Sequence, residues 1–186
     1  NVAEGRLELV REESDSEQIE AIDRALMRMD DLVDDLLALA REGERVSETE
    51  PVTLSQLAEK CWHNVETANA TLHTDGSKTI HADRSRLAQL LENLIRNAVE
   101  HGGQHVTITI GSLSDGFYVE DTGPGIPEDE RDDVFEAGYS TVDDGTGFGL
   151  SIVKQVAEAH GWEMRLTSGS DGGARFEITG IQSSER

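Results

Sequence analysis

The sequence predicts an α+β protein, in which a mixed β-sheet is covered by helices on one face and is preceded by an antiparallel helical hairpin. Two observations support this fold class. From about residue 54 onward, stretches with a helical spacing of apolar residues are mixed with stretches of strict alternation, without a regular strand–helix–strand repeat. The first 46 residues instead carry a narrow apolar seam, which is typical of paired helices. We therefore expect a hairpin over residues 1–46 and a sheet domain over residues 47–182.

The hairpin is predicted from apolar residues at intervals of three and four between Ile19 and Ala40. The same spacing occurs in residues 3–10, and Ser14 with Glu17 forms a capping-box pattern between the two stretches. Two helices of this length cannot bury a seam alone, so we expect dimerisation into a four-helix bundle. The alternative is that the hairpin packs on its own domain.

The sheet domain is expected to begin after a polar, aperiodic linker at residues 43–52. Thr53 and Gln56 have the spacing of a helix cap, and a second helix is expected from Arg84 to about His101. Alternating apolar residues predict strands around residues 79–82, 106–110, 117–119, 164–166 and 176–178.

The 186-residue chain has a formal net charge of −22, which disfavours nucleic acids and anionic membranes as partners. Self-repulsion weakens the compact state in dilute salt, but at 1 M salt the Debye length is only about 3 Å. The composition thus favours a protein adapted to concentrated salt, with an ordinary acidic protein as the alternative.

No segment resembles a membrane span or a signal peptide, and the single Cys61 lies on an apolar helical stripe. We expect a soluble, cytoplasmic chain, attached or not to an upstream sensor.

One face of the helix expected from Arg84 carries Asn93, Asn97 and His101 at four-residue steps. Asparagine is a mediocre helix former, so two in register call for an explanation. A side-chain carbonyl is a hard oxygen ligand, suited to a Mg²⁺ ion that keeps its waters and bridges phosphates. A solvated helix face explains the pattern equally well.

A second candidate is the stretch VEDTGPGIP, residues 119–127. The alternation of Phe117, Val119 and Asp121 places a carboxylate on the apolar side of a strand end, where burial without a partner is costly. An ionised aspartate can accept a hydrogen bond from the exocyclic amine of adenine. Gly123 and Gly125 would let the following turn approach a flat ring. The alternative is an Asx turn, in which Asp121 bonds its own backbone.

A third candidate is GTGFGL, residues 145–150, in which three glycines alternate just before a helical pattern. No Gly-Lys-Ser/Thr ending is present and no strand precedes the glycines, so the P-loop and the dinucleotide fingerprint are both excluded. A glycine-rich segment at a helix N-terminus can deliver backbone amides to an anion. An ordinary flexible loop is the alternative.

The order and spacing of these motifs resemble the ATP-binding catalytic domain of sensor histidine kinases, in the gyrase, Hsp90, histidine kinase and MutL superfamily. LLENLIRNAVEHGG resembles the asparagine box, VEDTGPGIP the first glycine box, VFEAGYST the phenylalanine box and GTGFGLSIVKQVAEAHG the second glycine box. The resemblance covers about residues 54–180. The hairpin resembles the dimerisation and phosphotransfer helices of these kinases, and the acidic, lysine-poor composition is similar to that of halophilic archaeal members.

The resemblance implies a Bergerat-type fold, ATP and Mg²⁺ as cofactors, and transfer of the γ-phosphoryl group to a histidine. Asn97 would ligate Mg²⁺, Asn93 would line the phosphate side and Asp121 would accept from the adenine amine. Phe135 would belong to a mobile lid. The other residues implied at the nucleotide are His101, Gly123, Gly125, Ile126, Gly145, Thr146, Gly147, Gly149 and Leu150.

The implied partners are a second copy, through the hairpin, and the receiver domain of a response regulator. Glu100 and His101 stand where many members carry a basic and an aromatic residue, so we expect weak or salt-dependent nucleotide binding. Residues 1–43 contain no histidine, so we expect the acceptor just upstream of Asn1 or on another protein. The alternatives are a nucleotide-binding dimerisation module without kinase activity, and an ATPase or serine kinase of the same superfamily.

Overall fold

The computed structural model describes residues 22, 26, 29, 33, 46, 48–65, 67, 69–76, 78–103, 105–136, 138–139 and 147–181. The chain divides into two compact units, Asn1–Ala40 and Arg41–Arg186. In the first unit, the described residues Ile22, Leu26, Met29 and Val33 all have helical backbone. Of the other residues of the expected hairpin only Val46 is described, and its amide donates to the Ala159 carbonyl at 3.1 Å. The hairpin and its boundary at residue 46 therefore stay predictions.

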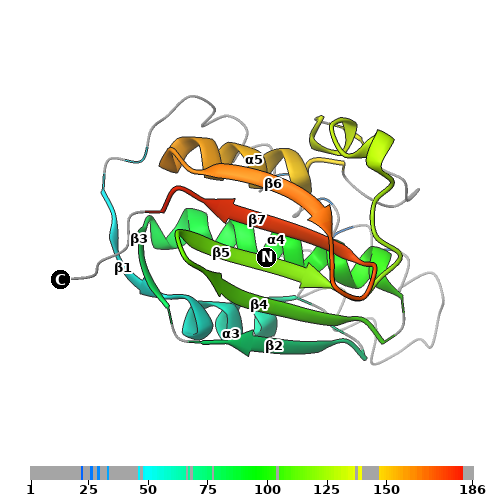
Figure 1. Ribbon diagram of the computed structural model, residues 1–186, viewed down its shortest axis with the longest axis horizontal. Helices are drawn as coiled ribbons and strands as arrows, with labels where there is room; N and C mark the ends of the chain where they lie inside the picture. Colours follow the sequence, from blue (N-terminus) through cyan, green and yellow to red (C-terminus); the bar gives the residue numbers. More distant parts are fainter. Residues whose placement is uncertain are drawn as a thin grey trace. The chain divides into compact units, whose positions relative to one another are not determined.

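The second unit contains a mixed five-stranded sheet in the order β2-β4-β5-β7-β6 (Figure 1). Strand β2 pairs with β4 in parallel, and the other neighbours are antiparallel. A two-stranded antiparallel sheet, β1 with β3, stands beside it. The bounds are β1 Glu50–Thr53, β2 Thr71–Asp75, β3 Thr79–Ala82, β4 Thr107–Leu113, β5 Gly116–Asp121, β6 Glu163–Ser168 and β7 Ala174–Thr179.

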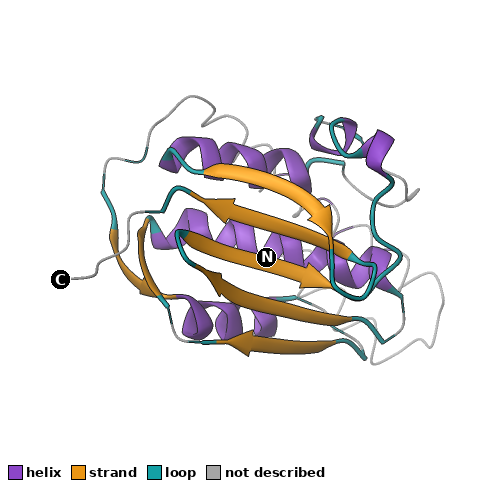
Figure 2. Cartoon of the chain, viewed as in Figure 1, coloured by secondary structure: helices purple, strands orange, loops and turns teal. Residues whose placement is uncertain are grey.

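Three helices cover one face of the five-stranded sheet (Figure 2). They are α3 Leu54–Asn64, α4 Arg84–Gly102 and α5 Gly149–His160, and two short 3₁₀ helices, η1 Glu128–Glu130 and η2 Asp133–Phe135, precede α5. The predicted fold class, an α+β sheet covered by helices on one face, is therefore confirmed. Within the described residues, none of the helices has the combined length and hydropathy that a membrane span requires.

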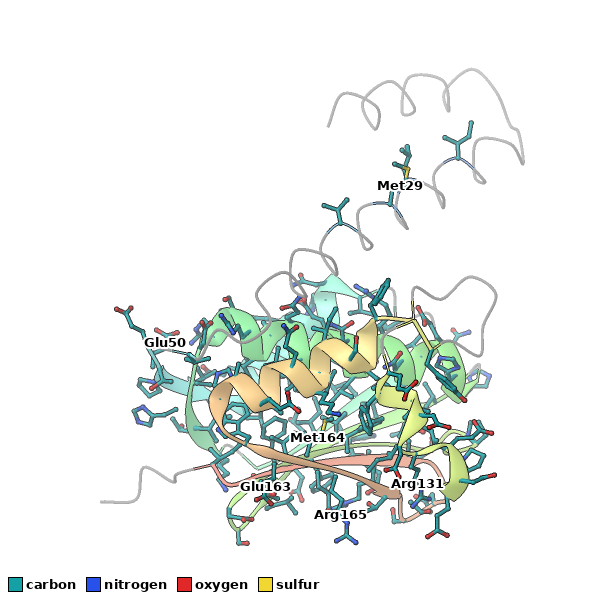
Figure 3. The ribbon with its side chains drawn as sticks, turned by 90° about the horizontal axis from the view of Figure 1, so that it is seen from above. Met29, Glu50, Arg131, Glu163, Met164 and Arg165 are labelled. Atoms are coloured by element: carbon teal, nitrogen blue, oxygen red, sulfur yellow. The ribbon has the colours of Figure 1, made fainter. Side chains whose placement is uncertain are left out.

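The core lies between this helical layer and the sheet. The apolar stripe of α4 is fully buried, as the spacing of its leucines predicts. Side chains of β6 alternate across the sheet: Met164 lies toward α5, whereas Glu163 and Arg165 project from the opposite side of the strand (Figure 3). The two faces of the sheet therefore differ, with an apolar inner face and a polar outer face.

The sequence analysis did not predict two of the strands, β1 and β2. Residues 50–52 were expected to belong to a linker, but residues 50–53 pair with β3 and bury Val52. The edge strand β2 has the sequence TLHTD, which offers no apolar alternation. Helix α3 begins after Thr53 as expected, but no side chain caps it, and Val65 already has extended backbone. Pairing with distant strands, rather than local sequence, determines β1 and β2.

Candidate functional site

Helix α4 is the platform of the site. The Asp83 carboxylate caps its N-terminus by accepting from the amides of Ser85, at 2.9 Å, and Arg86, at 3.1 Å. Ten residues further on, Asn93 is only 6% exposed. Its Nδ2 donates to the Gln89 carbonyl at 3.0 Å, one turn back along the helix. That bond fixes the amide and leaves Oδ1 for other partners.

Asn97 lies one turn after Asn93 and differs from it in one respect. Its Nδ2 is buried and has no hydrogen-bond partner among the described residues. Burying an unsatisfied polar group costs about 1–3 kcal/mol. This cost is removed when an acceptor reaches Nδ2, so Asn97 is a candidate for contact with a bound ligand.

The N-terminus of α5 faces the two asparagines. A Cβ atom at Gly149 would lie 3.1 Å from Asn93 Oδ1 and 3.7 Å from both amide atoms of Asn97. No side chain caps this helix. Gly149 thus allows the positive end of a helix to approach two amide side chains, with half-buried Leu150 behind it.

Gly147 has a different function from Gly149. Its φ is +71°, and a Cβ atom there would lie 2.7 Å from the carbonyl carbon of Gly138. The Gly138 amide also donates to the Gly147 carbonyl at 2.9 Å. The missing side chain therefore permits contact between two backbones. Gly145 and Thr146 lie outside the described residues.

The second predicted motif places Asp121 at the end of β5, where it is 9% exposed. Oδ1 accepts from the amide of Gly123 at 2.7 Å and from that of Ala174 at 3.3 Å. The Asx turn considered as the alternative is thus formed, but it uses only one carboxylate oxygen. In the described part of the chain, Oδ2 accepts no hydrogen bond. The carboxylate can be held by its own turn and still accept a donor from a ligand.

Burial raises the pKa of the Asp121 carboxyl, and the neighbouring Glu120 adds to this effect. The amides of Gly123 and Ala174, together with exposed His101, act in the opposite direction without reversing it. An ionised Asp121 is therefore costly in the fold. A donor that met Oδ2 would reduce that cost.

The turn after Asp121 packs against two other parts of the site. A Cβ atom at Gly123 would lie 2.7 Å from the Cα of Gly102, at the end of α4. Gly125 has a φ of +73°, and a Cβ atom there would lie 2.5 Å from the Gly172 carbonyl oxygen. Ile126 follows, half-buried, and its carbonyl accepts from Arg131 Nε at 3.2 Å. The first glycine motif is thus enclosed between α4 and the β6–β7 turn.

The structure brings Asn93, Asn97 and Gly149 together, and it places Gly147 against Gly138. The turn after Asp121 lies at the C-terminal end of α4. Phe135 packs edge-on against Phe176 of β7, with ring centroids 6.4 Å apart. Sequence reasoning gave no ligand role to residues 172–174, yet they contact both Asp121 and Gly125. The one available signal was the pair of glycines directly before a strand.

No group of three or more histidine, cysteine or acidic side chains suited to a metal ion occurs in the described part of the chain. A metal here would depend on the asparagine amides and on oxygens of a ligand. Mg²⁺ is held in that way in many sites, by one or two protein ligands together with phosphates and water. The amide oxygens of the asparagines fit such an ion, whereas the unpartnered Nδ2 of Asn97 is a donor that fits a phosphate oxygen.

Comparison with known proteins gives concordant matches. The family model described as histidine kinase-, DNA gyrase B-, and HSP90-like ATPase matches residues 82–181, more than half of the chain. Sensor histidine kinase ZraS of Escherichia coli O157:H7 is 37% identical over 116 residues, which cover 60% of this chain and 24% of ZraS. The chain thus spans about a quarter of the length of that relative.

Solved structures agree with the sequence matches. The mycobacterial sensor histidine kinase MprB has a TM-score of 0.62 and 25% identity, over 73% of this chain and 99% of the MprB chain. Full-length ShkA in complex with AMPPNP has a TM-score of 0.72 and 28% identity, over 91% of this chain and 39% of ShkA.

Proposed function

Because the chain belongs to the histidine kinase-, DNA gyrase B- and HSP90-like ATPase family, we propose that it binds Mg²⁺·ATP as the catalytic domain of a sensor histidine kinase. The proposal rests on two atoms for which the described residues supply no hydrogen-bond partner, the buried Nδ2 of Asn97 and Oδ2 of Asp121. A nucleotide can supply both partners: a phosphate oxygen can accept from Asn97 Nδ2, and the adenine amine can donate to Asp121 Oδ2. The similarity to ShkA, whose structure contains AMPPNP, supports the same ligand.

In this proposal Asp121 Oδ2 accepts from the exocyclic amine of adenine, since an ionised carboxylate only accepts hydrogen bonds. Asn93 lines the phosphate side and Asn97 offers its amide oxygen to Mg²⁺. The N-terminus of α5 stabilises phosphate charge with its backbone amides. Mg²⁺, when bound, neutralises part of the phosphate charge. His101, Gly123, Gly125, Ile126, Gly147 and Leu150 shape the pocket, and we assign Gly145 and Thr146 to the phosphate loop.

We assign phosphoryl transfer to positioning and electrostatics, which account for most of the catalysis of such reactions. In this proposal the receiving histidine is not among residues 1–62, because the first histidine of the sequence is His63. The next acceptor is an aspartate of a response regulator.

The first unit supplies the proposed dimer contact. The seam residues Ile22, Met29 and Val33 expose 49%, 61% and 53% of their surface, so a second copy of the seam would bury them. This interpretation retains the domain limits 1–46 and 47–182.

A second candidate function is a nucleotide-responsive dimerisation module without catalysis, favoured by the absence of histidine from residues 1–43. Phosphorylation of a separately supplied helical bundle that carries a histidine separates the two candidates. Phosphate release without any acceptor would instead favour an ATPase.

The test of the binding site is titration of the whole chain with a fluorescent ATP analogue, with and without Mg²⁺. We expect Mg²⁺-dependent binding, weakened about tenfold or more in Asn97→Ala, because a charge-assisted contact is removed. The matched control is Asn64→Ala on α3, whose exposed amide donates to Glu92 at 2.8 Å. Equal affinities in Asn97→Ala and the wild type would contradict the proposal.

The same titration at about 0.1 M and 1 M potassium chloride tests the proposed adaptation to concentrated salt, as in halophilic archaea. A net charge of −22, which includes the charge of Glu100 on α4, opposes the approach of a triphosphate. We expect tighter binding at the higher salt concentration. Binding that weakens with salt would argue for an ordinary acidic protein.

A further inference from the structure

The outer face of β5 carries a carboxylate that the nucleotide site does not use. Glu120 precedes Asp121, so its side chain points to the face of the sheet opposite the helices. It is nevertheless only 9% exposed. The β6–β7 turn lies over it, and a Cβ atom at Gly169 would be 3.0 Å from Glu120 Cγ. A buried carboxylate on the open face of a sheet requires an explanation.

Both carboxylate oxygens of Glu120 are occupied. Oε1 accepts from the amide of Ser170 at 2.8 Å and from its hydroxyl at 2.5 Å. Oε2 accepts from Arg175 Nη1 at 2.7 Å. Burial alone would raise the pKa of Glu120, but the bonds from Ser170 and Arg175 outweigh burial and lower the pKa below its ordinary value. Glu120 is therefore held in its ionised form by the β6–β7 hairpin.

Arg175 is itself fixed. Its guanidinium lies 3.7 Å from the centroid of the Tyr118 ring and donates through Nε to Glu177 at 2.8 Å. An arginine that is already held by stacking on Tyr118 and by the Glu177 carboxylate loses little further freedom when it binds Glu120. The pair of Glu120 and Arg175 thus attaches the turn to the rigid centre of the sheet.

The turn that Glu120 holds, residues 169–173, is the support of Asp121. A Cβ atom at Gly173 would lie 1.9 Å from the Asp121 carbonyl oxygen and 2.6 Å from its Oδ1. The next amide, that of Ala174, donates to the same Oδ1. The orientation of the Asp121 carboxylate therefore depends directly on the position of this turn.

Arg131 ties the same hairpin to the first glycine motif. Its Nε donates to the Ile126 carbonyl at 3.2 Å and its Nη2 to the hydroxyl of Ser168 at 2.8 Å. In Figure 3, Arg131 lies beside the end of this hairpin. Two residues thus anchor the β6–β7 hairpin. Arg131 joins it to the turn after Asp121, and Glu120 joins it to the outer face of β5.

We propose that Glu120, bonded to Ser170 and Arg175 on the outer face of the sheet, is a positioning residue that holds the β6–β7 turn so that Asp121 faces the nucleotide base. This inference rests on the proposed ATP site. Glu120 does not contact the ligand. It acts through the turn, and its influence is confined to the base end of the pocket.

The test compares ATP with inorganic triphosphate, each with Mg²⁺, by calorimetric titration of the whole chain. In Glu120→Gln we expect the dissociation constant for ATP to rise roughly fivefold, because a charged hydrogen-bond acceptor is lost. The constant for triphosphate, which has no base, should stay unchanged. Ser170→Ala removes one hydroxyl and should show a smaller loss, which Ser170→Thr restores. The matched control is Glu177→Gln, which removes the other carboxylate partner of Arg175 without contacting the turn.

A second readout needs no ligand. The amide resonances of Gly123 and Ala174 report the two hydrogen bonds to Asp121 Oδ1, and both should shift in Glu120→Gln but not in Glu177→Gln. Three results in Glu120→Gln would each overturn the proposal. They are an equal loss of affinity for ATP and triphosphate, an unchanged affinity for ATP, and unchanged amide resonances of Gly123 and Ala174. Should Glu120→Gln fail to fold, Ser170→Ala decides by the same criteria. A wild type that binds no ATP would refute the proposed function, while the resonances would still test the role of Glu120.

Discussion

The two ends of helix α4 are built in opposite ways. At the N-terminal end, the Asp83 side chain caps the helix and its backbone amide donates to His160 Nε2 at 3.0 Å. Toward the C-terminal end, Asn97 keeps a buried Nδ2 without a partner among the described residues, and Asp121 beside it has a raised pKa. Polar groups at the first end are satisfied by the protein. At the second end, Asn97 Nδ2 and Asp121 Oδ2 have no partner within the described residues, and a ligand could supply both.

The comparison indicates that the N-terminal end of α4 contributes to the stability of the fold, whereas the C-terminal end has groups available to a ligand. Groups whose hydrogen bonds are complete lower the free energy of the folded state, whereas incompletely bonded buried groups raise it. Variants at the N-terminal end should therefore change unfolding and leave nucleotide binding intact. Variants at the C-terminal end should weaken nucleotide binding and leave the free energy of unfolding nearly unchanged.

The largest expected effect belongs to Asp121→Asn. The amide oxygen can still accept from Gly123 and Ala174, but the amide nitrogen then faces the ligand with a donor in place of an acceptor. We expect affinity for ATP to fall by about 10- to 100-fold, the range for loss of a hydrogen bond to a charged group. Calorimetric titration measures it, and undiminished affinity would remove Asp121 from the base site.

The same variant should be no less stable than the wild type at neutral pH. Because its pKa is raised in the fold, Asp121 contributes most to stability at low pH, and that contribution is lost as the pH rises through the raised pKa. Asparagine does not ionise and avoids this loss. A marked drop of the melting temperature at pH 7 in Asp121→Asn would contradict the division of α4 into a stable end and a binding end.

The architecture around α4 shows how far the sequence can lead. The helix was expected from Arg84 to about His101 and spans Arg84–Gly102, because a strong apolar stripe and local end signals coincide. The sequence also predicts the asparagine face and both glycine motifs as candidate site elements, since each is a local pattern within a few residues. The contact of Gly173 and Ala174 with Asp121 joins positions more than fifty residues apart, and no local pattern encodes it. Strand β2 escaped for the same reason, as only its pairing with β4 defines it.

A smaller effect is expected at the other end, for Asp83→Ala. Loss of a helix cap costs about 1 kcal/mol of unfolding free energy, while affinity for ATP should stay within twofold of the wild type. Although burial opposes it, hydrogen bonds from Arg86 and Ser85 lower the pKa of Asp83. Its contribution to stability is thus present above the ordinary carboxyl pKa and lost as the pH falls through the lowered value. Asp83→Asn, which can still cap, serves as the control in denaturant unfolding, and a parallel loss of binding would break the comparison.

The smallest effect is a pH dependence that His160 imposes on the satisfied end. Its Nδ1 donates to the Val156 carbonyl at 2.8 Å, Nε2 accepts from Asp83, and the ring stacks on Trp162 with centroids 4.1 Å apart. These two bonds require the neutral ring, since a protonated Nε2 would face the Asp83 amide with a second donor.

Burial lowers the pKa of His160, and the cation of Arg86 adds to this, against the opposing effects of the Val156 carbonyl and the Asp83 carboxylate. The unfolded chain therefore binds this proton at a higher pH than the folded chain. The contribution of His160 to stability is fully present above the ordinary histidine pKa and declines as the pH falls below it toward the lowered value.

Unfolding at a series of pH values from about 7.5 to 5.5 should show a flatter profile for His160→Gln than for the wild type. His73→Gln, on the exposed surface of edge strand β2, is the matched control and should keep the wild-type profile. Identical profiles for His160→Gln and the wild type would mean that the N-terminal end of α4 is not held by a neutral histidine.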